Sequence, residues 1–89
     1  MPYIKQEDRQ YYDGLIDEMV SVIRDNNERT GLSGTLNYII TRLVKGAYGE
    51  CRYNDYNSIV GLLECAKMEL YRRSVAPYED TKIEENGDV

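Results

Sequence analysis

The middle of this 89-residue sequence places a tyrosine beside two cations. Tyr38, Thr41, Arg42 and Lys45 are spaced i, i+3, i+4 and i+7, which aligns them on one face of a helix. A tyrosine ring stacks on a nucleobase, and the two cations neutralise phosphate. We therefore predict that Tyr38, Arg42 and Lys45 bind a small anionic ligand of the nucleotide type. The alternative is an ordinary solvated helix face.

A second basic cluster lies further along the chain, at Tyr71, Arg72 and Arg73. Both arginines follow Glu69 at the spacing of an intrahelical salt bridge. By helical angle, Arg73 also continues an apolar stripe that includes Leu62. A guanidinium at the end of a buried stripe binds a carboxylate or a phosphate with two parallel hydrogen bonds. We predict these three residues as further ligand-binding residues. The alternative for Arg73 is an ion pair with an acid of the tail or of a second subunit.

Catalytic chemistry finds little support in the sequence. The chain has no histidine, so mechanisms and metal sites that need an imidazole are excluded. Asp13 and Asp17 are spaced i, i+4, and two carboxylates hold Mg²⁺ only with help from phosphates or further acids. A magnesium-dependent nucleotide hydrolase is therefore a remote alternative. Cys51 and Cys65 lack a histidine base, and we expect two reduced thiols, with Cys65 a small buried apolar residue. We expect no catalytic residue, metal or cofactor.

Net charge and hydropathy narrow the class of partner. The formal net charge is −5, with acidic segments at residues 1–30 and 74–89 and a basic segment at residues 31–73. This net acidity argues against general nucleic-acid binding. No apolar run approaches the roughly 18 residues of a membrane span, and the first residues do not resemble a signal peptide. We therefore expect a cytoplasmic protein with no membrane contact.

Apolar residues recur at helical spacing in three stretches. The first helix is predicted over about residues 6–24. The second is predicted to begin near Ser33, as its N-cap, and to end at Gly46 or Gly49. The third and longest is predicted over about residues 55–75.

Asn54 or Asp55 is predicted to cap the third helix, and Pro77 is predicted to end or kink it, because proline disfavours helical geometry at the residue before it. A short fourth helix over residues 77–86 is predicted next, with a stop at Asn86 and Gly87. Disorder is the alternative for this segment. We expect residues 1–5 and 87–89 to be flexible ends.

The third helix is apolar around too much of its circumference for a small monomer. Its apolar residues spread over roughly 180°, which two shorter helices hardly cover. Gly61, in the middle of this helix, costs about 1 kcal/mol relative to alanine, and the close approach of another backbone would explain it. We predict a homo-oligomer with the third helix at the interface. A closely packed three-helix core is the alternative.

Several sequence segments resemble a known family. Residues 34–43 are GTLNYIITRL, residues 52–67 contain RYNDYN and GLLECAK, and residues 69–89 contain ELYRR, APYED and KIEENGDV. These segments are similar to an uncharacterised family of short proteins from bacteriophages and prokaryotes. The resemblance covers about residues 34–89. It implies a small accessory protein, in the host cytoplasm if the protein is phage-encoded, and it transfers no catalytic residue.

The sequence thus predicts a single all-α domain over residues 1–89, built as a bundle of three or four helices. The leading functional hypothesis is a non-catalytic binding protein that sequesters a nucleotide-type ligand or a host protein. The alternative is a structural or regulatory homo-oligomeric interaction protein with no small-molecule ligand.

Overall fold

The computed structural model describes residues 3–89, which are helical and contain no strand. Residues 1 and 2, part of the predicted flexible end, lie outside the described residues. Residues 3–89 contain five α-helices rather than the predicted three or four, together with one 3-10 helix and one π-helix. In chain order the elements are η1 (Gln6–Tyr11), α1 (Asp13–Asp25), α2 (Asn27–Thr30), α3 (Leu32–Tyr48), α4 (Tyr53–Leu70), η2 (Tyr71–Val75) and α5 (Ala76–Asn86).

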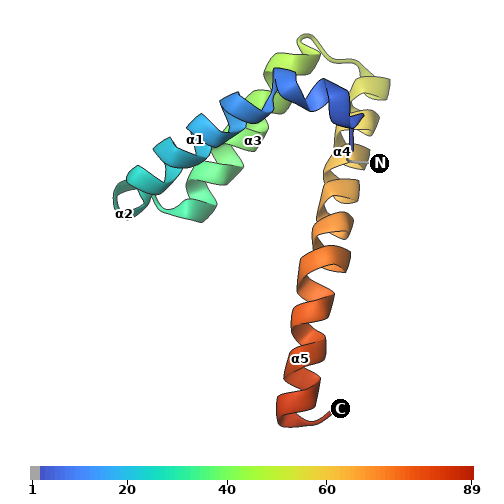
Figure 1. The fold of residues 1–89 in the computed structure, drawn as a ribbon. Coiled ribbons are helices and arrows are strands. Elements are labelled where there is room, and N and C mark those ends of the chain that lie inside the picture. Colours follow the sequence, from blue (N-terminus) through green and yellow to red (C-terminus); the bar gives the residue numbers. More distant parts are fainter. Residues whose placement is uncertain (1–2) are drawn as a thin grey trace. The chain divides into compact units, whose positions relative to one another are not determined.

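The described residues divide into two units, Tyr3–Cys51 and Arg52–Val89. The first unit is a helical hairpin. Figure 1 shows α1 in blue and α3 in green as its two arms, joined through the short helix α2. The predicted first helix is divided in two, because Tyr12 leaves helical geometry between η1 and α1.

A glycine sets the turn from α2 into α3. The predicted N-cap, Ser33, is already inside the helix, and Gly31 is the N-cap instead. Gly31 has φ 77° and ψ 142°, which a residue with a Cβ rarely adopts. Its carbonyl accepts the first hydrogen bond of α3, from the Thr35 N–H at 3.2 Å. The helix ends at Gly49, one of the two predicted stops, with φ 70°.

The second unit is a single continuous helical rod in which α4, η2 and α5 follow one another without a break (Figure 1). It spans 18, 5 and 11 residues, about 50 Å at 1.5 Å per residue. The rod begins at Tyr53, earlier than predicted. Neither Asn54 nor Asp55 is its N-cap. Arg52 takes that place, and its N–H donates to Asp55 Oδ2 at 3.0 Å.

Pro77 does not end the rod, which was one of the two outcomes predicted for it. Ala76, the residue before it, has φ −60° and ψ −46°, which is regular helical geometry. The π-helical turn η2 directly precedes Ala76, whose N–H donates to the Tyr71 carbonyl five residues back. A wider turn is one of the known ways in which a helix accommodates the missing donor and the bulk of proline. The predicted helix at 77–86 is thus confirmed as α5, but as a continuation.

No side chain among residues 3–89 is fully buried, and many large apolar side chains are exposed. Cys65, predicted to be buried, is exposed, because its helix α4 has no second helix beside it in its unit. Neither unit by itself contains a closely packed core. Each unit presents apolar surface that it does not itself cover.

Candidate functional site

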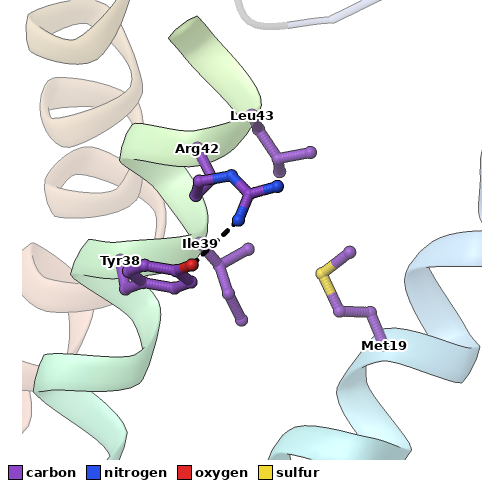
Figure 2. Close-up of a pocket in the computed structure, with 5 residues that line it drawn as sticks. All are labelled: Met19, Tyr38, Ile39, Arg42 and Leu43. Atoms are coloured by element: carbon purple, nitrogen blue, oxygen red, sulfur yellow. Dashed lines mark hydrogen bonds between the residues drawn. The ribbon is translucent and has the colours of Figure 1, made fainter. Parts of the chain in front are cut away.

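The first candidate site lies on α3, where the sequence predicted it. Arg42 Nη1 donates a hydrogen bond to the Tyr38 hydroxyl oxygen at 2.8 Å, and the guanidinium carbon lies 5.7 Å from the Tyr38 ring centroid. The two residues are one helical turn apart, which is why they meet. Figure 2 shows the guanidinium beside the tyrosine hydroxyl, with Met19 of α1 facing them.

Tyr38 and Arg42 line a hollow of about 270 Å³ between α1 and α3. Its other lining residues are Met19, Ile39 and Leu43. Arg42 therefore lies beside the apolar face of α3, next to Ile39, rather than directly opposite that face. An arginine in this position has its side-chain carbons against apolar neighbours and its charge at the rim. The hollow combines an aromatic ring, a cation and an apolar wall.

Tyr38 also borders a second hollow, of about 310 Å³, on the N-terminal side of α3. Its other lining residues are Thr30, Gly34 and Thr35. Thr35 Oγ1 donates to Thr30 Oγ1 at 2.7 Å, so two hydroxyl groups face this space together. These three residues were not among the ligand-binding residues predicted from the sequence. The available signal was the spacing of Gly34 and Tyr38, one turn apart on α3.

The remaining predicted residues of this face make few contacts. Thr41 Oγ1 donates to the Asn37 carbonyl at 2.8 Å, inside its own helix. Lys45, one turn beyond Thr41, forms no ion pair with any of residues 3–89. The structure therefore joins Tyr38 to Arg42 and leaves Lys45 exposed on the next turn.

The second candidate cluster lies on the rod, in the other unit. Arg72 Nη2 contacts Glu69 Oε1 at 2.6 Å, and Arg73 Nε lies 4.0 Å from the same oxygen. This is the salt-bridge pattern that the spacing indicated. The side chain of Glu69 is only 17% exposed. A ligand at these arginines would have to compete with Glu69.

Tyr71 contacts an acid that spacing alone did not indicate. Its hydroxyl donates to Glu79, with 3.1 Å to each carboxylate oxygen. The two residues are eight apart, whereas a regular α-helix aligns positions seven apart. The π-helical turn between them adds one residue to the rod, which brings Glu79 into line with Tyr71. The hydrogen bond and the negative charge of Glu79 both raise the pKa of Tyr71 above 10.0.

The described residues form neither a metal site nor a membrane-spanning helix. Over residues 3–89, no group of three or more Cys, Asp or Glu side chains is arranged to hold a metal ion. Cys51 Sγ lies 3.4 Å from the Gly49 carbonyl, and both cysteines are free. Within the same residues, no helix has the length and apolar character to span a bilayer.

The hairpin also contains an apolar groove of about 530 Å³ between α1 and α3. Sequence analysis predicted the apolar faces of both helices but not the open space between them. The groove is lined by Tyr12, Leu15, Ile16, Met19, Val20, Ile23, Leu36, Ile39, Ile40 and Leu43.

These features define a small helical protein whose apolar helix faces remain open. The chain belongs to the DUF6899 family, a domain of unknown function that matches residues 1–89. This agrees with the resemblance to an uncharacterised family. No curated protein matches the chain. No solved structure matches it either.

Proposed function

We propose that this protein is a non-catalytic interaction protein that works as an assembly of its own copies. The observation that carries the proposal is the exposed apolar surface: no side chain of residues 3–89 is fully buried. In the hairpin, Leu15, Ile16 and Leu43 are each more than half exposed. On the rod, Val60 and Leu70 are more than half exposed as well.

Apolar surface of this extent on a free chain favours association, because its burial is the main driving force of assembly. A binding partner of another kind would use the same surface, so the mass of the purified protein is decisive.

The rod contributes one of the proposed contacts. Ile59, Leu63, Ala66 and Leu70 follow one another along one side of α4, and no second helix of that unit lies beside them. An isolated helix is marginally stable in water, and packing supplies most of the stability of helices in proteins. We infer that this side of α4 packs against another copy.

Sedimentation equilibrium of the full chain at tens of micromolar tests this proposal. We expect a mass of two or more copies and a helical signal in circular dichroism that falls on dilution. A monomeric mass with an unchanged helical signal across the same concentrations would contradict the proposal.

A second candidate function is capture of a small anionic ligand on α3, favoured by the Tyr38–Arg42 pair beside its hollow. A thermal-shift screen with mono-, di- and cyclic nucleotides tests it. At 100 times its dissociation constant a ligand adds about 2.7 kcal/mol to the free energy of unfolding. We expect Arg42→Ala to abolish the shift and the charge-matched control Arg24→Ala, on α1, to retain it. Absence of a shift with any nucleotide contradicts this candidate.

The cellular location and role of the protein are also proposed. The similarity to short phage and prokaryotic proteins favours an accessory role in the cytoplasm, in that of the host if the protein is phage-encoded. Such a role needs a binding surface rather than catalytic residues. Sequestration of a host protein or of a nucleotide signal fits it. Co-purification from infected or expressing cells would test this setting.

A further inference from the structure

The open groove of the hairpin is an apolar surface that its own unit leaves uncovered. It measures about 530 Å³, and all of its lining residues are apolar or tyrosine. Leu15, Ile16 and Leu43 are each more than half exposed although they lie on the facing sides of α1 and α3. An apolar concavity between two antiparallel helices is one half of a four-helix bundle. Water in this groove would be displaced by any apolar helix pair of similar length.

The two arms of the hairpin carry opposite charge. Helix α1 contains four carboxylates and a single arginine, whereas α3 contains Arg42 and Lys45 and no acid. No ion pair among residues 3–89 joins a carboxylate of α1 to either cation of α3. The acids of one arm and the cations of the other are therefore available to a second molecule.

We propose that the occupant of the groove is the same hairpin of a second copy, with each α1 packed against the partner's α3. This inference rests on the proposed self-assembly and adds its geometry. Two hairpins related by a two-fold axis form a four-helix bundle in which both grooves close at once. Contact between α1 and the partner's α3 places acids beside cations. Contact between two α1 helices, or between two α3 helices, places like charges together, which is unfavourable.

Helical geometry indicates which charges border the contact. Asp13 and Asp17 lie beside the groove residues Ile16 and Val20 on α1. On α3, Arg42 lies beside the groove residue Ile39 and lines the adjoining hollow together with it. These charged side chains pair at the exposed rim of the bundle. Their pairing therefore determines the orientation of the two copies and the salt dependence of association more than its affinity.

The first experiment tests whether the groove is the contact. Ile40→Asp places a charge on the groove, and Thr41→Asp places the same charge one residue further, outside the groove. In sedimentation equilibrium we expect Ile40→Asp to weaken association by at least about 30-fold, the loss of one buried aliphatic side chain. We expect Thr41→Asp to change it by less than about threefold, as exposed substitutions do. If both variants self-associate as strongly as the wild type, the proposal is overturned.

The second experiment identifies the occupant and does not depend on a folded groove variant. One chain carries Asp13→Lys and Asp17→Lys, and the other carries Arg42→Glu. Each variant alone sets like charges across the contact, so we expect each to associate about tenfold more weakly at low salt. Mixed together, they restore opposite charges on both sides, and we expect a mixed dimer of near wild-type affinity.

The outcomes separate this inference from the proposed function. A monomeric wild-type chain shows that the groove is covered within one molecule, which overturns both. A wild-type assembly whose charge variants associate normally, alone and mixed, overturns only the pairing of α1 with the partner's α3. If Ile59→Asp abolishes association and mixing the charge variants does not restore it, the groove is occupied by the rod of a second copy. This result also overturns the pairing of α1 with the partner's α3.

Discussion

The hairpin and the rod differ in what each can stabilise by itself. In the hairpin two amphipathic helices face each other, so each supplies part of the apolar surroundings of the other. In the rod a single helix continues from α4 to α5 and has only its own side chains as neighbours. The hairpin is thus half of a core, whereas the rod has no core within its unit.

The polar contacts of the rod do not compensate for this difference. Lys67 pairs with Glu64 at 3.1 Å, and Lys82 pairs with Glu85 at 3.1 Å. Such exposed pairs, three or four residues apart, contribute about 0.2–0.5 kcal/mol each. A few of them do not maintain a helix about 50 Å long in water without tertiary packing. The rod therefore depends on another molecule more strongly than the hairpin does.

The substitution with the largest expected effect on stability tests the contact side of the rod. Ile59→Asp should destabilise the assembled protein by about 2–3 kcal/mol, because a buried aliphatic side chain loses its transfer free energy and a charge takes its place. Met68→Asp, on the opposite side of α4, is the matched control and should have little effect. Urea unfolding followed by circular dichroism measures both. Similar losses for the two variants would show that α4 has no preferred contact side.

The next effect concerns the turn of the hairpin. Gly31→Ala should lower the free energy of unfolding by about 1–2 kcal/mol, because φ 77° is strained for a residue with a Cβ. Gly46→Ala, inside α3 with no atom near the added Cβ, should stabilise by up to about 1 kcal/mol. Thermal unfolding of the two variants measures the difference. If both were stabilising, the turn would tolerate a different backbone geometry.

Gly61→Ala tests the rod at a glycine. No atom of the chain lies within 4 Å of the added Cβ. By helical angle Gly61 lies near Met68, away from the Ile59 side. We therefore expect the variant to stabilise the protein by up to about 1 kcal/mol through helix propensity. A loss of self-association instead would indicate that another backbone approaches α4 on this side.

The smallest effect is a dependence on alkaline pH. Because Glu79 raises the pKa of Tyr71, the folded state holds the phenolic proton more tightly than the unfolded state. The stabilising contribution is complete below pH 10.0 and is lost as the pH rises through the higher pKa of the folded state. Tyr71→Phe should be slightly less stable at neutral pH and lose less stability above pH 10.0. Parallel pH curves for the variant and the wild type would contradict this.

Much of the fold followed from the sequence because its signals are local. Apolar periodicity indicated helices in all three main stretches, and Gly49 and Gly87 end α3 and α5 with positive φ. The N-terminal signals were less specific. Ser33 is a good N-cap by type, but Gly31 precedes it and takes the non-helical geometry that begins α3. A capping preference ranks residues and does not choose between neighbours.

The errors on the rod have a shared cause. A π-helical turn has no strong sequence signature, so regular α-helical spacing was assumed through residues 71–75. That assumption made Pro77 a break and concealed the contact of Tyr71 with Glu79. By contrast, the Tyr38–Arg42 and Glu69–Arg72 pairs were predictable, because each lies within one regular turn. Predicting the groove requires the distance between α1 and α3, which apolar periodicity does not give.

The extra residue in η2 also changes which side chains lie in line along the rod. With regular spacing, the column that begins at Ile59 would pass through Pro77. Shifted by one position, the same column reaches Tyr78 and then Lys82, whose ammonium lies 5.6 Å from the Tyr78 ring centroid. A molecule that follows this column towards the C-terminus would meet an aromatic ring and a positive charge in place of an imino acid. Deleting a single residue from 71–75 would rotate the acidic C-terminal segment by about 100° about the helix axis while leaving its composition almost unaltered.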